Sequence, residues 1–407
     1  MAMNIIALEA LTFGLGRLAE ASKKYGCSLT LLTRDKTVYS YELSSLDERL
    51  VKVVEIDTFD NNRVVQLIRG EGDAVALLSS TDTWSLHCLD VSGILNLHAQ
   101  NPDAIRIARD KFQLRNRLFE AGLSSVRSIL VDPKNFHKNS LAENFSFPCI
   151  IKDSAGTGSQ NVWVAYSEEE LLKILVKADQ ETIRGKIVIE PFFSGTLYSL
   201  ETISWKGETR VIALTSRVLS QEPYFREEAF SSPVTISDSV SDALDAWIKR
   251  VLHCIGYDNG FAHTEFMITS NGFEVIEINP RLGGVQIGEA LCQSFGINIY
   301  EAWIEMALNR RPNLLDAPLE SNKGIGQLIV YATEAGEFSH IEGIERLDAH
   351  PGRPKFYPTA YCGKKINTID DQRASIGILL AEGETSEIAL LNAFAARNKI
   401  RVIMKKN

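Results

Sequence analysis

Residues 261–281 read FAHTEFMITSNGFEVIEINPR and are the most informative segment of the chain. Two apolar, β-rich runs flank an Asn-Gly dipeptide, and this pattern is a strong signal for a β-hairpin. On the second run Glu277, Asn279 and Arg281 recur with a period of two, so we expect their side chains on one face of a strand. Polar groups that alternate with isoleucines in this way indicate a binding face rather than an ordinary solvated one.

The register of this hairpin determines whether two carboxylates meet. A strict two-residue loop would place Glu265 opposite Ile278, on the wrong face. A loop of residues 270–272, with Gly272 in a left-handed conformation, would place Glu265 directly opposite Glu277, and we predict this second case. Facing carboxylates repel one another, so we expect a cation between them. Hard oxygen ligands, including the amide of Asn279, favour Mg²⁺. An exposed acidic face balanced by an arginine remains the alternative.

Length and composition are those of an ordinary globular protein. The chain has 407 residues, 45% hydrophobic and 23% charged, and this size corresponds to about two to four domains. The formal charge of −9 argues against a nucleic-acid or anionic-membrane partner. Six widely spaced cysteines are typical of reduced thiols, and neither a secretory signal nor a membrane-length apolar run is present. We therefore expect a cytoplasmic protein.

Hydrophobic periodicity predicts an α/β and α+β protein of several domains. The first hundred residues alternate strands with helices, as in a Rossmann-like parallel sheet. Strands are expected there at 4–8, 28–33 and 73–79, and a helix at 13–24. Residues 103–118 predict one basic amphipathic helix, and residues 133–140 a linker. Further strands are expected at 147–152, 161–166 and 186–191, then a four-stranded meander at 199–205, 210–215, 261–269 and 273–279. From about residue 323 the pattern predicts a small α+β cap that ends in a helix at 387–397.

Residues 147–162, FPCIIKDSAGTGSQNV, place a lysine and a small-residue loop between two strands. Glycines let backbone N–H groups approach phosphate oxygens, and Lys152 at the strand end adds a point charge. The lysine precedes the glycines, so this is not a Walker loop. A glycine-rich hairpin is also common for purely structural reasons, and the residues alone leave both interpretations open.

Residues 186–195, KIVIEPFFSG, run from a strand into a proline–aromatic hinge. A purine ring needs an apolar slot and a few hydrogen bonds along its edge. The carbonyl of Pro191 and the N–H of Phe193 suit those bonds, and the aromatic rings suit the wall. Proline is acceptable at position 191 because only its carbonyl is required.

The order of these parts resembles the ATP-grasp superfamily of carboxylate–amine ligases. The resemblance spans roughly residues 100–310 and rests on the stretches ARDKFQLRNRLFEAGL, FPCIIKDSAGTGSQNV, IEPFFSG and GFAHTEFMITSNGFEVIEINPRLGG. The last of these is the most specific. The start of the chain and the HTEF motif look most like the L-amino acid ligase group, in the biotin-carboxylase-like branch.

The resemblance implies an ATP-grasp fold in four parts. Residues 1–103 correspond to a Rossmann-like pre-ATP-grasp domain and residues 104–196 to the small lid subdomain with its preceding helix. Residues 197–312 correspond to the central Mg/ATP subdomain, and residues 313–407 to an α+β cap. Because related folds are often dimeric, a homodimer is considered as well as a monomer.

The resemblance also implies a role for each residue that matches a family motif. The implied ATP-binding residues are Lys111, Lys152, Gly156, Thr157, Gly158, Ser159, Glu190, Pro191, Phe192, Phe193 and Glu201. Glu265, Glu277 and Asn279 would hold Mg²⁺, with Mn²⁺ as a second candidate. Leu197 departs from the pattern, because relatives often carry a glutamate there, and this departure leaves the contacts to the ribose open.

The implied reaction uses ATP to phosphorylate a substrate carboxylate, after which an amine displaces phosphate from the acyl phosphate. Arg281, Lys152 and His263 are the candidate catalytic residues. Lys152 and Arg281 would offset the negative charge that builds up, although an ion pair with Glu277 is the alternative for Arg281. His263 shares the strand face of the metal site and either steers the substrate or is a structural neighbour.

The leading hypothesis is an ATP-dependent ligase that joins an amino acid or small carboxylate to an amine. A purine-pathway or bicarbonate-activating enzyme of the same fold is one alternative, and a nucleotide-binding switch protein without catalysis is another. The expected partners are small-molecule carboxylates and amines. Arg217 and Arg226 either recognise a substrate carboxylate or are ordinary loop charges.

Overall fold

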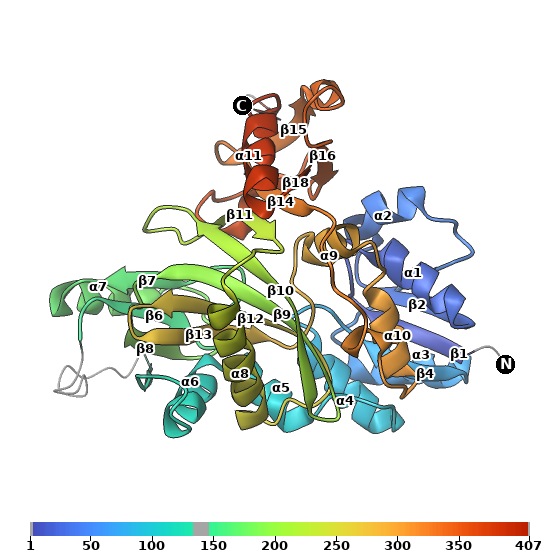
Figure 1. Cartoon of the computed structure of the whole chain (residues 1–407), viewed down its shortest axis with the longest axis horizontal. Coiled ribbons are helices and arrows are strands. Elements are labelled where there is room, and N and C mark those ends of the chain that lie inside the picture. The colour runs from blue at the N-terminus through green and yellow to red at the C-terminus, as the bar shows by residue number, and fades with distance from the viewer. Residues whose placement is uncertain (1–2, 133–145, 406–407) are drawn as a thin grey trace.

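The computed structural model describes residues 3–132 and 146–405, which form four β-sheets with helices packed on them (Figure 1). In this view an N-terminal sheet lies at the right, a lid sheet at the left and a central sheet between them, with the C-terminal helix at the top. The predicted multidomain α/β and α+β architecture is confirmed. No helix within the described ranges is long and apolar enough to cross a membrane.

The N-terminal sheet is parallel and has the order β3-β2-β1-β4. Its strands are β1 (Met3–Leu8), β2 (Cys27–Thr33), β3 (Lys52–Glu55) and β4 (Ala74–Leu78), and its helices are α1 (Leu15–Lys24), α2 (Ser40–Ser45), α3 (Asn61–Glu71) and α4 (Ser85–Leu95). The predicted strands, helix and parallel pairing are confirmed. Because the strands run in one direction, the loops after β1 and β4 lie at the same edge of the sheet. Both loops border a cavity that residues 281–289 also line.

The helix expected at 103–118 is in fact two helices, α5 (Pro102–Arg109) and α6 (Lys111–Glu120). Asp110 lies between them in an extended conformation, and its carboxylate accepts hydrogen bonds from two N–H groups in the first turn of α6. Aspartate is a favoured N-cap residue. The prediction of one helix was wrong because continuous apolar periodicity concealed this cap. The break places Lys111 at the N-terminus of α6.

The lid sheet is antiparallel and has the order β5-β8-β6-β7. Its elements are β5 (Ile129–Val131), β6 (Cys149–Asp153), β7 (Val162–Ala165), α7 (Glu168–Ala178) and β8 (Ile187–Pro191). The strands expected in this region are confirmed, and the predicted linker at 133–140 lies outside the described residues. β8 pairs with both β5 and β6, so the strand that leads into the proline hinge lies inside the sheet.

The central sheet has the order β13-β12-β9-β10-β11-β14-β18-β16. Its elements up to the hairpin are β9 (Thr196–Trp205), β10 (Glu208–Leu219), β11 (Glu227–Ser232), α8 (Asp238–Cys254), β12 (Gly260–Thr269) and β13 (Gly272–Asn279). The predicted meander was wrong, because β12 pairs with β9 and not with β10. Helix α8 connects β11 to β12 and packs Ile248 and Val251 into the same core as Phe266.

The β12–β13 hairpin brings Glu265 directly opposite Glu277, as predicted. The predicted three-residue loop was wrong, since Thr269 pairs with Gly272 and the loop contains only residues 270–271. The register shifts immediately after Glu265. This β-bulge, and not the length of the loop, aligns the two carboxylates.

The C-terminal region extends the central sheet with β14 (Gly324–Tyr331), β18 (Ser375–Gly383) and β16 (Lys355–Pro358). Its other elements are α9 (Ile287–Phe295), α10 (Tyr300–Ala307), β15 (Gly336–Glu342), β17 (Lys365–Ile366), α11 (Ser386–Arg397) and β19 (Arg401–Met404). Short 3₁₀ turns cover Lys36–Tyr39, Asn313–Leu315, Ile344–Arg346 and Gln372–Ala374. The expected C-terminal helix is confirmed as α11. It approaches the sheet closely, because a Cβ at Gly326 or Gly383 would collide with the backbone of Ala389.

The turn before α1 shows how the N-terminal sheet docks on the rest of the chain. Gly14 has a φ of +92°, and the ring of Tyr300 in α10 occupies the place of a Cβ. The N–H groups of Gly14 and Gly16 donate to the carboxylate of Glu42, at 3.2 and 2.9 Å. Glycine is therefore required at position 14 both for its conformation and for this contact.

Candidate active site

A cavity of about 640 Å³ lies between the lid sheet and the central sheet. Every site residue predicted from the sequence lines it except Glu201. The apolar side chains of Ile150, Leu197, Met267 and Ile276 also border it. A cavity of this size and mixed character can hold a nucleotide-sized ligand.

The paired carboxylates lie on the central-sheet side of the cavity, and each lies beside a cation, although Arg217 also pairs with Glu227. Arg217 Nη2 lies 3.1 Å from Glu265 Oε1, and Lys111 Nζ lies 3.3 Å from Glu277 Oε2. Asn279 Nδ2 donates to Glu277 Oε1 at 3.0 Å. Burial opposes ionisation, but the charge of Lys111 and the Asn279 hydrogen bond outweigh it and lower the pKa of Glu277 to about 2. The side chains of Glu265 and Glu277 are mostly shielded from solvent, which does not fit an exposed acidic face.

This arrangement of oxygens suits a hard divalent cation. Two carboxylates of lowered pKa face each other beside an amide, and such ligands are those that Mg²⁺ prefers. Within residues 3–132 and 146–405, no group of three or more His, Cys, Asp or Glu side chains is placed to hold a metal. Coordination here would therefore draw on Asn279, on water or on phosphate oxygens in addition to the two glutamates.

His263 is wholly enclosed and is held by acidic groups on both ring nitrogens. Nδ1 makes a short hydrogen bond with Glu201, and Nε2 lies 3.3 Å from Glu265 Oε1 and 2.9 Å from Arg217 Nη1. Burial alone would lower the pKa of His263, but the charge and hydrogen bond of Glu201 outweigh this effect and raise it. Glu201 also accepts from the N–H of Gly283 at 3.0 Å. Glu201 thus holds both His263 and the loop at Gly283 in place, and it does not border the cavity.

On the lid side, Lys152 and Glu190 form a buried ion pair, and Arg115 Nε adds a second contact to Glu190 at 2.9 Å. Burial lowers the pKa of Lys152 and dominates over the opposing charge of Glu190. The Nζ of Lys111 donates to the carbonyl of Gly156 at 2.7 Å. Lys111 therefore connects the glycine loop of the lid to Glu277 of the central sheet.

The glycine loop between β6 and β7 is anchored at its base by Asp153. The carboxylate of Asp153 accepts from the N–H groups of Ala155, Arg184 and Gly185, at 3.0, 2.7 and 2.9 Å. Beyond this base, Gly158 and Ser159 have φ values of +65° and +58° and line the cavity. The loop presents backbone and small side chains to the cavity, which is what close approach to phosphate requires.

The hinge after β8 supplies aromatic surface to the same cavity. Phe192 and Phe193 both line it, and the ring of Phe193 lies 4.8 Å from the guanidinium carbon of Arg115. The N–H of Phe192 donates to the carbonyl of Pro148 at 3.0 Å, which ties the hinge to the start of β6. Arg115 thus connects the Phe193 ring to Glu190.

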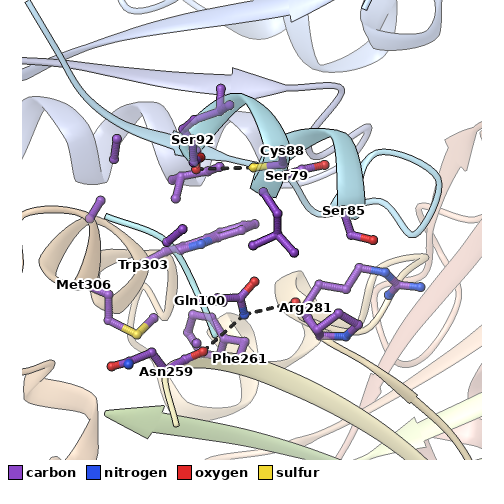
Figure 2. A pocket seen from close by; sticks show the side chains of 18 of the residues that line it. Ser79, Ser85, Cys88, Ser92, Gln100, Asn259, Phe261, Arg281, Trp303 and Met306 are labelled. Carbon is purple, nitrogen blue, oxygen red and sulfur yellow. Dashed lines mark hydrogen bonds between the residues drawn. The ribbon is translucent and has the colours of Figure 1, made fainter. Parts of the chain in front are cut away.

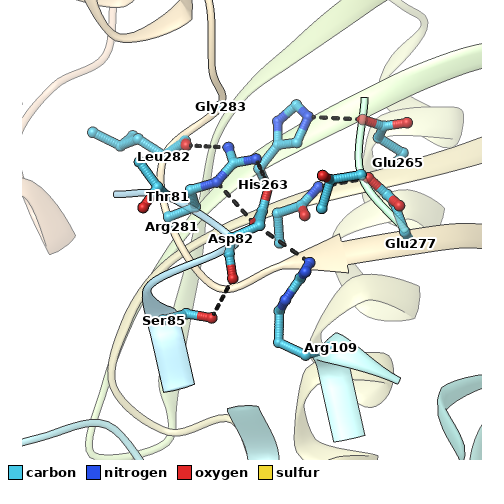
Figure 3. Close-up of polar contacts among 12 residues, drawn as sticks. Thr81, Asp82, Ser85, Arg109, His263, Glu265, Glu277, Arg281, Leu282 and Gly283 are labelled. Carbon is cyan, nitrogen blue, oxygen red and sulfur yellow. Dashed lines mark hydrogen bonds and ion pairs between the residues drawn. The ribbon is translucent and has the colours of Figure 1, made fainter. Parts of the chain in front are cut away.

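Arg281 does not pair directly with Glu277. Its Nε and Nη2 both donate to Asp82 of the N-terminal sheet, the former at 3.0 Å, and Nη1 donates to the carbonyl of Leu282 at 2.9 Å (Figure 3). Burial works against its charge, but Asp82 outweighs burial and raises the pKa of Arg281. Arg109 Nη1 lies 3.5 Å from the same carboxylate.

Sequence analysis missed several residues that the fold brings to this site. They are Asp82, Arg109, Arg115, Glu227 and Gln372. Asp82 follows a strand of the parallel sheet at its carboxyl edge, and that position was a usable signal. Arg217, weighed as a substrate-binding residue or a loop charge, is buried beside Glu265. Arg226 instead pairs with Glu228 and stacks 4.0 Å from the ring of Tyr331, and it is not among the cavity-lining residues.

A second cavity of about 470 Å³ adjoins the first one and shares Asp82, Arg281 and Gly284 with it. Leu11 to Phe13, residues 80–84 and the start of α9 border it. A third, small cavity of about 70 Å³ lies on the far side of Arg281, bordered by Trp303 and Phe261 (Figure 2). Arg281 is therefore common to all three.

Comparison with known proteins identifies two family domains. Residues 145–289 match the model of the ATP-grasp domain, and residues 328–405 match the model of L-amino acid ligase C-terminal domain 2. The L-amino acid ligase from Bacillus licheniformis has a similar fold, with a TM-score of 0.82 and 20% identity over 99% of each chain. This likeness extends over the whole length of the chain.

Two curated relatives are similar to this chain over part of its length. The uncharacterized protein y4rH of Sinorhizobium fredii is 24% identical over 82% of this chain and 69% of its own length. The L-arginine-specific L-amino acid ligase of Bacillus subtilis is 26% identical over 50% of this chain, which spans about half (51%) of that protein. Together with the domain matches, these findings confirm the predicted ATP-grasp fold, the likeness to amino-acid ligases and the class of enzyme, an ATP-grasp ligase.

Proposed function

We propose that this chain is an ATP-dependent carboxylate–amine ligase. It activates a small carboxylate or amino acid as an acyl phosphate and joins it to an amine, often that of an amino acid, with release of ADP and phosphate. The observation that carries the proposal is the pairing of Glu265 with Glu277 across one ladder, with Lys111 beside them and Arg281 two strand positions beyond Asn279. These groups supply the metal ligands and the positive charges that phosphoryl transfer from ATP requires.

The larger cavity is the proposed ATP site. The hinge residues Phe192 and Phe193 offer an apolar slot for adenine, and the glycine loop with Lys111 and Lys152 offers N–H groups and positive charge to the phosphates. Lys152 and Lys111 each have a carboxylate partner in this structure, so both are oriented before nucleotide binds. Closure of the loop would exclude water from the reacting groups.

Glu265, Glu277 and Asn279 are the proposed ligands of Mg²⁺, with Mn²⁺ as a substitute. The ion would neutralise charge on the phosphates and hold their oxygens in place. Arg217 and Lys111, which balance the carboxylates in this structure, are close enough to share in that neutralisation.

The proposed reaction has two steps. A carboxylate oxygen of the substrate attacks the γ-phosphorus of ATP, the bond to the β–γ bridging oxygen breaks, and ADP leaves. The amine nitrogen then attacks the acyl carbon, phosphate leaves, and the nitrogen loses its proton. Arg281 lies where the two cavities join, so its guanidinium can hold oxygens of the carboxylate or the transferred phosphoryl group. His263, enclosed between Glu201, Glu265 and Arg217, would hold Glu265 in place beside the reacting groups.

The second cavity is the proposed site of the amine substrate. It adjoins the first at Arg281 and Gly284, and it is bordered by both apolar and hydroxyl side chains. The match of residues 328–405 to the L-amino acid ligase domain favours an amino-acid ligase over a purine-pathway or bicarbonate-activating enzyme. The complete set of lysines, carboxylates and Arg281 favours catalysis over a switch that only binds nucleotide.

A phosphate-release assay tests the proposal. The protein is incubated with Mg-ATP and pairwise mixtures of the amino acids and common di- and tricarboxylates, and product masses are recorded. We expect release that requires two partners, with a product lighter than their sum by one water. ATP binding without release from any pair would count against a ligase of amino acids and small carboxylates and favour the switch protein.

A further inference from the structure

Asp82 is the one acidic residue that the N-terminal sheet places against Arg281 in the described residues. It lies in the loop after β4, and the hydroxyl of Ser85 donates to its backbone carbonyl at 2.9 Å. Its carboxylate accepts two hydrogen bonds from Arg281 (Figure 3). The side chains of Arg281 and Asp82 are both largely buried, with exposed fractions of 14% and 13%. A bidentate pair in this setting fixes the plane of the guanidinium.

The remaining donors of Arg281 can be counted. A guanidinium carries five N–H groups, one on Nε and two on each terminal nitrogen. Asp82 takes one from Nε and one from Nη2, and the carbonyl of Leu282 takes one from Nη1. One N–H on each terminal nitrogen is left without an acceptor among the described residues. Two such groups on adjacent nitrogens suit two oxygens of a phosphoryl or carboxylate group.

An Arg–Asp pair is neutral overall, and a neutral pair attracts an anion only weakly. Arg109 changes the balance, because its Nη1 lies 3.5 Å from the same Asp82 oxygen and its side chain is only 11% exposed. The three side chains carry a net charge of +1 at neutral pH. The cluster can therefore aim Arg281 through Asp82 and still attract an anion.

We propose that Asp82 is a positioning residue that aims the free N–H groups of Arg281 at the junction of the two cavities, where they hold the transferred phosphoryl group. The inference rests on the proposed function and extends the reaction centre to the N-terminal sheet. It also explains why the loop after β4 borders both cavities. Without Asp82, the long side chain of Arg281 would sample several rotamers, and its N–H groups would no longer point at the junction of the cavities.

The test uses inorganic phosphate, the product, as the probe. Phosphate is titrated calorimetrically into protein saturated with Mg-ADP, and ADP affinity is measured separately. We expect Asp82→Asn to weaken phosphate binding about tenfold or more, because an amide turns a donor toward the guanidinium. ADP affinity should stay within about twofold. Asp82→Glu, which keeps the charge, should recover part of the loss.

Asp47→Asn is the matched control, because Asp47, between α2 and β3, also pairs bidentately with an arginine, Arg49, but on the protein surface. It should bind phosphate as the wild type does. Unchanged phosphate affinity in Asp82→Asn would overturn the proposal, as would equal loss of phosphate and ADP affinity with a lower melting temperature, or a wild type that binds no phosphate. Failure of the ligase proposal appears separately, as absence of phosphate release from every substrate pair.

Discussion

Arg115 joins the lid to the central sheet, and replacing it tests whether that contact holds the two together. Its Nε contacts Glu190 of β8, while Nη1 lies 3.1 Å from Glu274 of β13 and Nη2 donates to the carbonyl of Val275. The side chain is only about 2% exposed. Arg115→Met keeps the apolar stem and removes these contacts.

The pKa of Glu190 indicates the size of the effect. Burial favours the neutral form, but Arg115 and then Lys152 hold the pKa of Glu190 at about 2. An unfolded glutamate has a pKa of about 4.3, and this difference is worth about 3 kcal/mol. Glu274 keeps its hydrogen bonds to Ser124 and Ser125 in the variant, so the loss of its contact with Arg115 costs less free energy than the loss at Glu190. Lys152 still pairs with Glu190 in the variant, so only part of this energy is lost, and we expect Arg115→Met to reduce the free energy of unfolding by about 2–3 kcal/mol at pH 7.

Urea denaturation at several pH values measures this loss. Because the pKa of Glu190 is lowered by folding, its pairing stabilises the protein above pH 5 and is lost as the pH falls from about 4.3 toward 2. The gap between variant and wild type should therefore narrow over that range. Arg117→Met, an exposed arginine of the same helix, is the control and should cost no more than about 0.5 kcal/mol. A loss below about 1 kcal/mol in Arg115→Met, or a difference between variant and wild type that does not change with pH, would contradict the proposed role of Arg115.

The remaining predictions concern the reaction centre and the docking of the N-terminal sheet. Glu277→Gln should slow phosphate release about 100-fold or more with an unchanged melting temperature, because the metal loses a charged ligand; ATP consumption at the wild-type rate would contradict the proposed metal site. Lys152→Ala should weaken ATP binding about tenfold or more in calorimetry, and equal affinity would remove Lys152 from the phosphate site. Gly14→Val should destabilise the protein by about 2–3 kcal/mol in denaturation experiments, because Tyr300 fills the space and φ is positive. Gly70→Ala, in open space on α3, is its control and should be neutral or slightly stabilising.

Local pattern was enough to predict the elements that carry the proposed site. Period-two alternation identified β12 and β13, and glycine clustering identified the loop between β6 and β7. The pairing of Glu265 with Glu277 was also predicted, although a bulge produces it and not the proposed loop. Bulges depend on how a strand packs against its neighbours, and the sequence of one hairpin does not reveal that packing.

Hydrophobic periodicity gave a wrong prediction where a single residue ends a helix or where a strand pairs with a partner distant in the sequence. Asp110 divides the helix expected at 103–118, because one capping side chain outweighs the apolar periodicity around it. The pairing of β12 with β9 involves strands about 60 residues apart, as in the pair His263 and Glu201. Hydrophobic alternation is the same for either neighbour, so the order of strands was not readable.

The carboxylates, lysines, glycine loop and Arg281 of the proposed site could all be read as local motifs in the sequence, because periodicity and turn residues act over a few positions. How their charges are balanced depends on the packing of the sheets and could not be read from the sequence. Arg217 on Glu265, Arg115 on Glu190 and Asp82 on Arg281 all come from other elements. A buried charge is stable only beside an opposite one, and which partner reaches it depends on how the sheets pack.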